Sequence, residues 1–359
     1  MRRGLLDSHG TSIDALAAGA GRWRAHGLDE AQIRALLAPD EASLGRCRAW
    51  LAEPGHHLLG WHDPDYPPLL RRIASPPLAL FVAGDPALLW HPAVAVVGSR
   101  NATAGGRDNA RDFAHAFASS GLCVASGLAA GIDTAAHEGA LAAGGLTLAV
   151  LGTGPDVAFP RGNAGLLARI ASRGTVVSEH PPGTGPRREH FPSRNRILAG
   201  LSLGTVVVEA AERSGALITA RQAAEAGREV FAVPGSIHNP LARGCHRLLR
   251  DGAGLVESAA EVIGALVPLA TELAEALRGR LEAPISRPGV VVAASAMGPG
   301  NLDPDYQCLW QALGHDPTGM DQLVLRTGLT TAELSSMLLV MELEGRVVAQ
   351  HGRYTRKSS

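Results

Sequence analysis

Between residue 94 and about residue 233, short continuous apolar runs alternate with longer stretches whose apolar positions recur at helical spacing. Continuous apolar runs are typical of strands buried on both faces of a parallel sheet. We therefore expect strands at Val94–Val97, Leu122–Ala125, Leu146–Leu151, Thr175–Val177, Thr205–Val208 and Val230–Val233. Helices are expected between them, near 104–119, 132–143, 163–172, 194–200 and 216–227. This pattern predicts an α/β domain with helices on both faces of a parallel sheet.

The chain before this block shows two different patterns. Residues 1–60 carry short helical patterns, including Asp29–Leu37 and Ser43–Leu51, and predict a small helical accessory domain. The following segment up to residue 92 is rich in proline and holds one short apolar strand, Leu78–Val82. We expect that segment to bridge into the sheet domain, which then covers residues 61–263.

Glycine and polar residues gather in the segments that follow the predicted strands. Because the carboxyl ends of parallel strands meet at one edge of a sheet, these segments should lie close together. Glycine lets the backbone approach a ligand, and a glycine loop that leads into a helix start presents N–H groups to phosphate. The loops also carry arginines, so they predict a site for an anionic ligand. The candidate residues are Gly98, Ser99, Arg100, Ser126, Gly127, Gly131, Asp133, His190, Phe191, Arg194, Asn195, Arg196, Ser214, Gly215 and Thr219.

The run Phe191–Arg196 is the most informative of these segments. Ser193 has the side chain of a helix N-cap, which would place Arg194 and Arg196 in the first helical turn. Cations are unfavourable at a helix start, and a bound polyanion would reverse that effect. On this interpretation Arg194→Ala keeps or slightly raises stability without ligand. The alternative is that both arginines pair with carboxylates in a structural network.

Several classes of chemistry find no support in the sequence. Lys357 is the only lysine, so a phosphate-binding loop with a Walker lysine is excluded, and the glycines do not follow the dinucleotide-binding spacing. Asp133 and His137 lie four apart and can pair on one helix, and Glu209 can bond to the loop that follows its strand. We expect no catalytic residue, no metal site and no cofactor.

The composition limits which ligands, cofactors and cellular compartment can be expected. The net charge of -1 excludes a globally basic protein, so contacts with nucleic acid require a local patch. The four cysteines are far apart in the sequence, which indicates neither a zinc ribbon nor a disulfide scaffold. No stretch is apolar enough to span a bilayer. We expect a cytoplasmic protein without membrane contact.

The ordered motifs of residues 61–260 resemble those of the DprA/Smf family, the bacterial DNA-processing proteins of natural transformation. The matching residues are Asp63–Pro67, Val96–Arg100, Ser126–Leu128, Gly131–Asp133, Ala136–His137, Ser178–Glu179, Pro181–Gly183, Phe191–Pro192, Arg194–Arg196, Ser214–Ala220 and Val233–Gly235. The resemblance implies an extended Rossmann-like domain that binds single-stranded DNA. It also implies delivery of the strand to the RecA recombinase, a homodimer and no enzymatic step.

The chain departs from the family pattern at three places. Ala130 stands where an arginine is usual, Phe159 where a tyrosine is usual, and His246 where an asparagine is usual. None of these changes removes Arg100, Arg194 or Arg196. Phosphate contacts should therefore dominate, with Phe191 either stacking on a base or packing at the helix entry.

The rival hypothesis is an enzyme similar to the LOG nucleotide phosphoribohydrolases. Those enzymes use an arginine and a glutamate beside a loop with paired glycines. Here Leu201–Thr205 precedes Glu209, and the paired glycines are absent. This absence favours binding over hydrolysis.

Beyond the sheet domain, residues 264–302 are expected to form a linker, with a helical stretch at 270–281 and a run rich in Pro, Gly, Ala and Ser from Pro284 to Pro304. Residues 303–359 predict a last unit that resembles the family's winged-helix domain. Its expected helices are Tyr306–Leu313, Met320–Arg326 and Thr331–Leu343, and its expected wing pairs Val347–Ala349 with Gly352–Tyr354.

The charge of this last unit favours a protein contact over a DNA contact. Seven acidic residues and one arginine, Arg326, lie between residues 303 and 344, and the presumed recognition helix from Thr331 to Met337 carries no cation. A helix that reads the major groove normally brings arginine or lysine.

Overall fold

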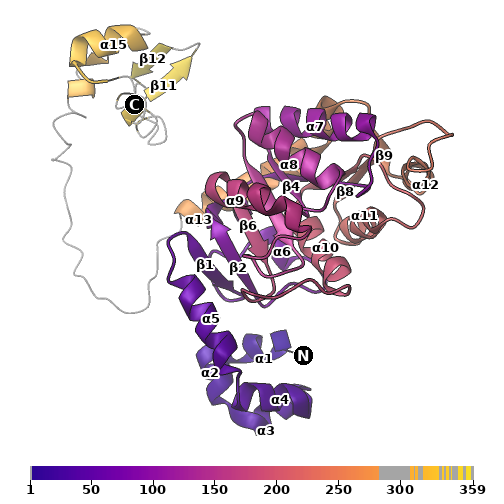
Figure 1. Ribbon diagram of the computed structural model, residues 1–359. Coiled ribbons are helices and arrows are strands. Elements are labelled where there is room, and N and C mark those ends of the chain that lie inside the picture. Colours follow the sequence, from indigo (N-terminus) through magenta and orange to yellow (C-terminus); the bar gives the residue numbers. More distant parts are fainter. Residues whose placement is uncertain are drawn as a thin grey trace. The chain divides into compact units, whose positions relative to one another are not determined.

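The computed structural model describes residues 2–282 and, beyond them, residues 308–310, 312–313, 318–330, 334, 337–338, 341, 347–350 and 353–356. The chain divides into two compact units, Met1–Pro284 and Ile285–Ser359 (Figure 1). Within the described residues, no helix combines the length and the apolar character needed to cross a membrane.

The first unit is built on a nine-stranded sheet. Its strands are β1 (His56–Gly60), β2 (Ala79–Gly84), β3 (Ala93–Val97), β4 (Cys123–Ser126), β5 (Thr147–Leu151), β6 (Thr175–Ser178), β7 (Gly204–Val207), β8 (Glu229–Ala232) and β9 (Gly254–Leu255). The bounds of β3 to β8 agree to within one residue with the strands expected from the apolar runs. These strands and β9 pair in parallel, whereas β2 is antiparallel to both β1 and β6. This is the expected α/β class with a Rossmann-like parallel sheet.

The order of the strands creates a switch point in the middle of the sheet. Across the sheet the order is β1-β2-β6-β5-β4-β3-β7-β8-β9. From β3 the chain builds outward through β4, β5 and β6, then returns to the other side of β3 to form β7. Ligands of open α/β sheets bind outside the carboxyl ends of the strands at such a reversal.

Helices cover both faces of the sheet because alternate strand residues point to opposite sides. In β3, Ala93, Ala95 and Val97 pack into one core cluster, and Val94 and Val96 into another. One face is covered by α6 (Pro68–Arg71), α10 (His190–Leu201), α11 (Gly215–Glu225) and α12 (Arg243–Arg250). The other face is covered by α7 (Ala104–Ser119), α8 (Ile132–Ala142), α9 (Ala164–Arg173) and α13 (Ala259–Glu282).

Five short helices precede the sheet: α1 (Arg2–His9), α2 (Ser12–Ala17), α3 (Gly19–Ala25), α4 (Glu30–Leu37) and α5 (Glu41–Leu51). Their own small core comprises Leu5, Ala15, Trp23, Leu28 and Ile33. Asp29 and Gln32 form a capping box that starts α4. Helices were expected throughout this region, but His56–Gly60 is a strand, because it pairs along its whole length with β2.

Two expectations about helix bounds were wrong. Helix α10 begins at His190 rather than after Ser193, so Ser193 lies inside the first turn and does not cap the helix. Helix α13 contains the helical stretch expected at 270–281, but it begins earlier, at Ala259, and ends at Glu282. The run from Pro284 to Pro304 lies outside the described residues.

The second unit contains a small sheet of β10 (Thr318–Gly319), β12 (Arg353–Arg356) and β11 (Val347–Gln350), together with α15 (Met320–Thr327). Strands β11 and β12 pair in antiparallel fashion, which is the expected wing. Its core includes Leu309, Leu313, Leu323, Leu334 and Met337. Helix α15 matches the expected stretch Met320–Arg326 with one further residue.

Candidate functional site

A cleft of about 430 Å³ opens at the switch point, between the carboxyl ends of β3 and β7. It gathers loops that are far apart in the sequence: the turn after β3, the start of α8, the middle of α10 and the start of α11. Nine of the residues predicted from the sequence line it, namely Gly98, Ser99, Arg100, Asp133, Arg194, Asn195, Ser214, Gly215 and Thr219. The cleft therefore lies where a parallel sheet with this order places its ligand.

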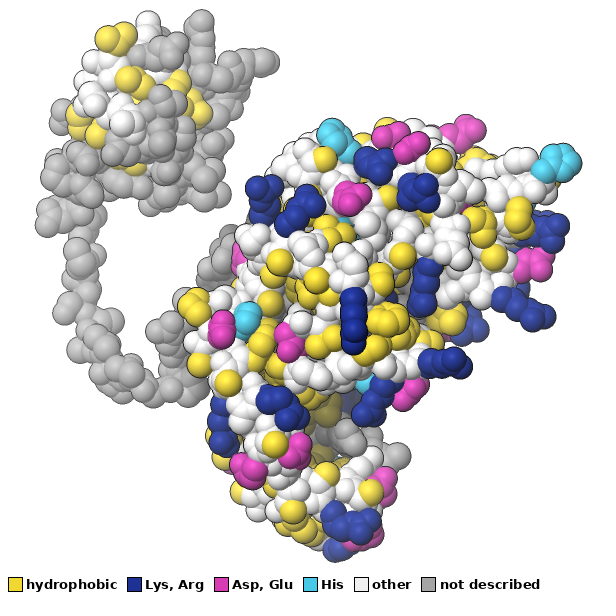
Figure 2. Space-filling view, in the orientation of Figure 1, with side chains coloured by type: hydrophobic (Ala, Val, Ile, Leu, Met, Phe, Trp, Pro, Cys, Tyr) yellow, Lys and Arg dark blue, Asp and Glu magenta, His cyan; other side chains and the backbone are white. Residues whose placement is uncertain are grey.

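Two exposed arginines stand at this cleft. Arg100 follows β3, and Arg213 precedes the N-cap of α11. Neither forms an ion pair with another residue that the structure describes. On the face shown in Figure 2, basic side chains are spread over the first unit with hydrophobic side chains between them. The cleft thus offers two unpaired cations to an anionic ligand.

A smaller hollow of about 140 Å³ adjoins the cleft and shares Arg100, Ala129 and Arg194 with it. Its wall carries two aromatic rings, Phe159 and Phe191, whose centroids lie 5.3 Å apart. The Arg100 guanidinium lies 5.6 Å from the centroid of the Phe191 ring. The two hollows together present aromatic faces and a cation side by side.

Asp133 changes what the cleft can bind. This carboxylate is buried at the start of α8, and its Oδ2 atom accepts hydrogen bonds from the backbone N–H groups of Gly127, at 3.1 Å, and Ala129, at 3.2 Å. Burial raises the pKa of Asp133, while Arg194 and the two N–H donors oppose that shift. Phosphate was expected at the helix start after Gly127. The Asp133 carboxylate places a negative charge there and already accepts hydrogen bonds from two N–H groups of the loop that leads into α8.

Arg194 is a scaffold residue. Because α10 begins at His190, Arg194 lies more than a turn inside the helix, and its guanidinium is buried. It donates hydrogen bonds to the carbonyl oxygens of Gly127, at 2.7 Å, and Val150. Burial lowers its pKa to about 10. The guanidinium thus ties the loop after β4 and strand β5 to α10, and the interpretation based on an unfavourable helix start was wrong.

Arg196 also has a structural partner. It donates to both carboxylate oxygens of Glu179, at 2.7 and 2.8 Å, in a partly buried pair. For this arginine the geometry is that of the structural alternative raised by the sequence. Nearby, the rings of His180 and His190 stack with centroids 3.8 Å apart. Burial, with His190 beside it, lowers the pKa of His180.

The remaining predicted residues shape the loops. The Ser126 hydroxyl is fully buried and donates to the carbonyl of Val96. Gly131 has a φ of +79°, and a Cβ there would collide with the carbonyl oxygens of Ser99 and Arg100. Ser214 caps α11 through the N–H of Ala216. Neither Ser126 nor Gly131 lines the cleft or the adjoining hollow, and the same is true of His190 and Arg196.

Glu209 and His137 form hydrogen bonds inside the fold and do not line the cleft. Glu209 accepts hydrogen bonds from the N–H and hydroxyl of Thr103, at 2.9 and 2.7 Å, and from the side chain of Asn239, at 3.2 Å. It thereby anchors the start of α7 and does not line the cleft. His137 bonds to Thr147 at 2.7 Å rather than to Asp133. Among the described residues, no cluster of His, Cys, Asp or Glu could hold a metal ion.

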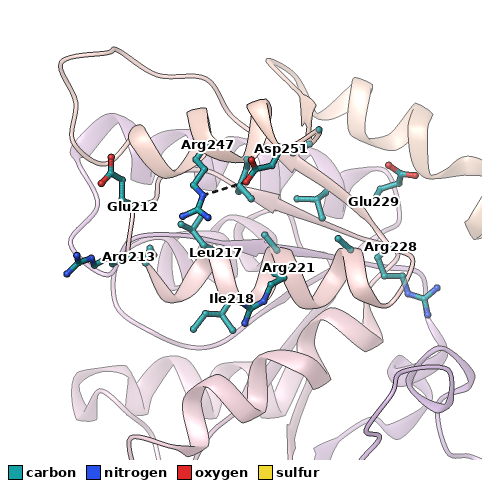
Figure 3. Close-up of a pocket in the computed structure, with 16 residues that line it drawn as sticks. Glu212, Arg213, Leu217, Ile218, Arg221, Arg228, Glu229, Arg247 and Asp251 are labelled. Atoms are coloured by element: carbon teal, nitrogen blue, oxygen red, sulfur yellow. Dashed lines mark ion pairs between the residues drawn. The ribbon is translucent and has the colours of Figure 1, made fainter.

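A larger groove of about 630 Å³ lies next to the cleft, between α11 and α12, and shares Arg213 and Ser214 with it (Figure 3). Two of its arginines lie beside acids. Arg247 lies 3.6 Å from Asp251, and Arg221, on the groove, lies 3.7 Å from Glu225. These two arginines are therefore less available to an anion than Arg100 and Arg213.

Sequence reasoning missed two residues of the site. Arg213 was not among the predicted residues, although Ser214 and Gly215, which follow it, were; an arginine directly before a capping serine was a usable signal. Phe159 was noted only as a substitute for tyrosine. Its place beside Phe191 depends on tertiary contacts, because 32 residues separate the two rings in the chain.

Comparisons with known proteins agree with this architecture. The chain matches the family described as DNA recombination-mediator protein A over residues 57–267 and the DprA winged helix domain over residues 293–353. It is 39% identical to Protein Smf of Synechocystis, covering 82% of this chain and 79% of that protein. It is 38% identical to Protein Smf of Escherichia coli, covering 92% of this chain and 85% of that protein.

Two solved structures share the fold. The X-ray structure of DNA processing protein A from Streptococcus pneumoniae has a TM-score of 0.61 and 41% identity, covering 66% of this chain and 83% of that one. DNA processing protein A from Helicobacter pylori, whose structure is described together with its single-stranded DNA binding mode, has a TM-score of 0.54 and 27% identity. That match covers 59% of this chain and 96% of the other. This chain belongs to the DprA/Smf family.

Proposed function

We propose that this protein binds single-stranded DNA through the switch-point cleft and the adjoining hollow, without strong sequence preference and without a catalytic step. One observation carries the proposal. The exposed Arg100 belongs to both hollows and lies beside the Phe159–Phe191 ring pair. A cation next to aromatic faces suits a strand whose phosphates and unstacked bases are both accessible.

The arginines and the phenylalanine rings of the site would contact different parts of the strand. Arg100 and Arg213 attract phosphates, which carry no sequence information. Phe159 and Phe191 offer faces on which bases stack, and every base has such a face. In a duplex the bases are already stacked on each other, so the aromatic contribution is available to single strands. The binding mode described for the Helicobacter pylori relative supports the same ligand class.

We further propose that the bound strand is protected and passed to the RecA recombinase during natural transformation and recombination, and that the protein acts in the cytoplasm as a homodimer. The family description as a recombination mediator supports this role. A RecA loading assay on protein-coated single strands tests it. Filament formation must accelerate when this protein is added, and an unchanged rate contradicts the proposal.

Salt dependence tests the DNA contacts directly. The slope of log affinity against log salt is about -0.7 per neutralised phosphate on a single strand. Arg100→Ala and Arg213→Ala should each flatten the slope by roughly one contact. Arg221→Ala is the matched control, because Arg221 is exposed on the same α11 but lies next to Glu225. If all three variants and the wild type show the same slope of log affinity against log salt, the arginines of the cleft do not contact the DNA.

The phosphoribohydrolase alternative makes a separate prediction. If Glu209 were a catalytic carboxylate, nucleoside monophosphates would release free base. Because Glu209 is bound to Thr103 and Asn239, we expect no release above a protein-free blank. Turnover that disappears in Glu209→Gln would establish the enzyme instead.

A further inference from the structure

Helix α5 joins the short N-terminal helices to the sheet, and one of its faces packs on the sheet domain (Figure 1). Trp50 anchors that face. Its ring stacks on His56 with centroids 3.9 Å apart, meets the Phe81 ring edge-on at 5.9 Å, and packs against the core cluster that β5, β6 and α9 share. A side chain one turn from Trp50 on the same face therefore points toward the sheet domain.

Arg46 is the cation on this face, because it lies four residues before Trp50. Its Nε atom lies 3.6 Å from the position that a Cβ on Gly183 would take, so its side chain runs along the loop that follows β6. Asp156, in the loop after β5, holds that loop by accepting a hydrogen bond from the Gly183 N–H at 2.8 Å. Arg46 thus lies at the same edge of the sheet as the cleft and the adjoining hollow.

The Arg46 guanidinium is available to a ligand. Its side chain is 56% exposed, and its ion pair with Asp40 is long, at 3.9 Å. Asp40 is the N-cap of α5 and accepts a hydrogen bond from the Ala42 N–H. An exposed pair at this distance holds the two side chains weakly. A phosphate can therefore compete for the guanidinium at little cost.

Further cations lie between Arg46 and the hollow. Residues 183–189 connect Gly183 to the start of α10 and carry Arg187 and Arg188, both exposed, against a single acid, Glu189. Neither arginine forms an ion pair with another residue that the structure describes. Phe191, which lines the hollow, follows in the first turn of α10. The loop thus offers positive charge along the surface from the ring pair to α5.

We propose, on the basis of the proposed function, that the bound strand continues from the hollow along residues 183–189 to α5, where Arg46 binds one of its phosphates. Phosphates recur at every nucleotide, so such a contact needs no particular base sequence. The N-terminal helical region is then part of the DNA interface, because α5 supplies the contact while Trp50 fixes its position on the sheet.

Arg46→Ala and Arg48→Ala form a matched pair for the test. Arg48 is an exposed arginine of the same helix. Two residues correspond to about 200° around a helix axis, so Arg48 lies on the other face. The strand should have about 20 nucleotides, which exceeds the usual site size of about 4–16.

Arg46→Ala should flatten the slope of log affinity against log salt by about 0.7, the value of one phosphate contact on a single strand. Arg48→Ala should leave the slope unchanged. Arg46→Lys keeps the charge and should retain the wild-type slope. Melting temperatures of the three variants, recorded without DNA, show whether each is folded.

The outcomes separate this inference from the proposed function. A wild-type slope for a folded Arg46→Ala overturns the path to α5, and the proposed function stands if Arg100→Ala still flattens the slope. Equal flattening by Arg46→Ala and Arg48→Ala also overturns the path, because it indicates an effect of net charge and not a contact. Failure of the wild type to bind the strand at all contradicts the proposed function itself.

Discussion

Arg100 and Arg194 carry the same charge and lie in the same cleft, yet their surroundings give them different roles. Arg100 is exposed beside Phe191, whereas Arg194 is buried and donates to the carbonyls of Gly127 and Val150. An exposed guanidinium is free to meet phosphate at little cost in stability. A buried one holds the scaffold, because its removal leaves buried carbonyl groups without a donor.

We predict that Arg194→Ala destabilises the protein by about 2–4 kcal/mol, since it breaks a buried hydrogen-bonded network. Arg100→Ala, the control, should change the free energy of unfolding by no more than about 0.5 kcal/mol. Denaturant unfolding of both variants measures this. An Arg194→Ala protein as stable as the wild type would show that these hydrogen bonds contribute little to the stability of the fold.

Because the His137 ring is buried, we predict that the stability of the protein depends on pH. Burial lowers the pKa of His137 from 6.5 to about 3. Its Nδ1 atom faces the Thr147 hydroxyl, which itself donates to the carbonyl of Val124, so the neutral ring donates from Nδ1. Below pH 6.5 the unfolded chain binds a proton that the folded chain refuses, so stability falls as pH falls toward about 3. The loss should approach about 1.4 kcal/mol per pH unit.

His137→Asn is the comparison, because its amide N–H can replace the Nδ1 donor without titrating. Its stability should be lower at neutral pH, owing to lost volume, but should decline less steeply on acidification. If the free energies of unfolding of the two proteins fall in parallel from pH 7 to about pH 5, His137 does not cause the pH dependence of stability in this range.

At the scale of elements, the loops at the carboxyl edge hold glycine for different reasons. Gly131 needs its positive φ, and its Cα faces the carbonyls of Ser99 and Arg100. Gly127 lies against the Arg194 guanidinium, so a Cβ would displace that side chain. Close packing of the loop after β3, the loop after β4 and α10 thus explains glycines that the sequence alone suggested were for phosphate.

We predict that Gly131→Ala destabilises the protein by at least about 2 kcal/mol, because it combines left-handed backbone strain with a steric collision. Gly105→Ala in α7 is the control. A Cβ at Gly105 meets no atom within 4 Å, so the variant should be neutral or up to about 1 kcal/mol more stable. Thermal melting of both proteins measures the contrast. Equal melting temperatures would show that the Gly131 loop adapts without strain.

At the scale of the whole molecule, the proposed contacts with DNA belong to one of the two units. The cleft, the adjoining hollow and their cations all lie within Met1–Pro284. In the second unit, the presumed recognition helix from Thr331 to Met337 carries no cation, which disfavours the reading of bases in the major groove. A contact with another protein remains our proposal for it.

We therefore predict that a chain ending at Pro284 keeps the single-strand affinity of the full protein to within about tenfold, or 1.4 kcal/mol. Titration of both proteins with the same oligonucleotide at one salt concentration measures this. The truncated chain carrying Arg100→Ala serves as the weakened control. A larger loss on truncation would assign a DNA contact to the winged-helix unit.

The sequence by itself determined the strands, the helices between them and the edge at which the functional loops meet. Apolar runs of this kind have few other stable arrangements, since a strand that is apolar on both faces must be covered on both. The positions of β3 to β8 follow from that pattern to within one residue. The same topology brought nine of the predicted residues into one cleft.

Only the tertiary structure decided what each side chain does there. Helix α10 begins at His190 and not after Ser193 as expected. Arg194 therefore lies inside the helix and points toward two carbonyl groups. The carboxylate of Asp133 binds two N–H groups of the loop before α8, and Phe159 lies beside Phe191. These outcomes depend on contacts between residues distant in the chain. Such contacts decide whether a charged side chain is buried or exposed, and the local sequence pattern does not determine them.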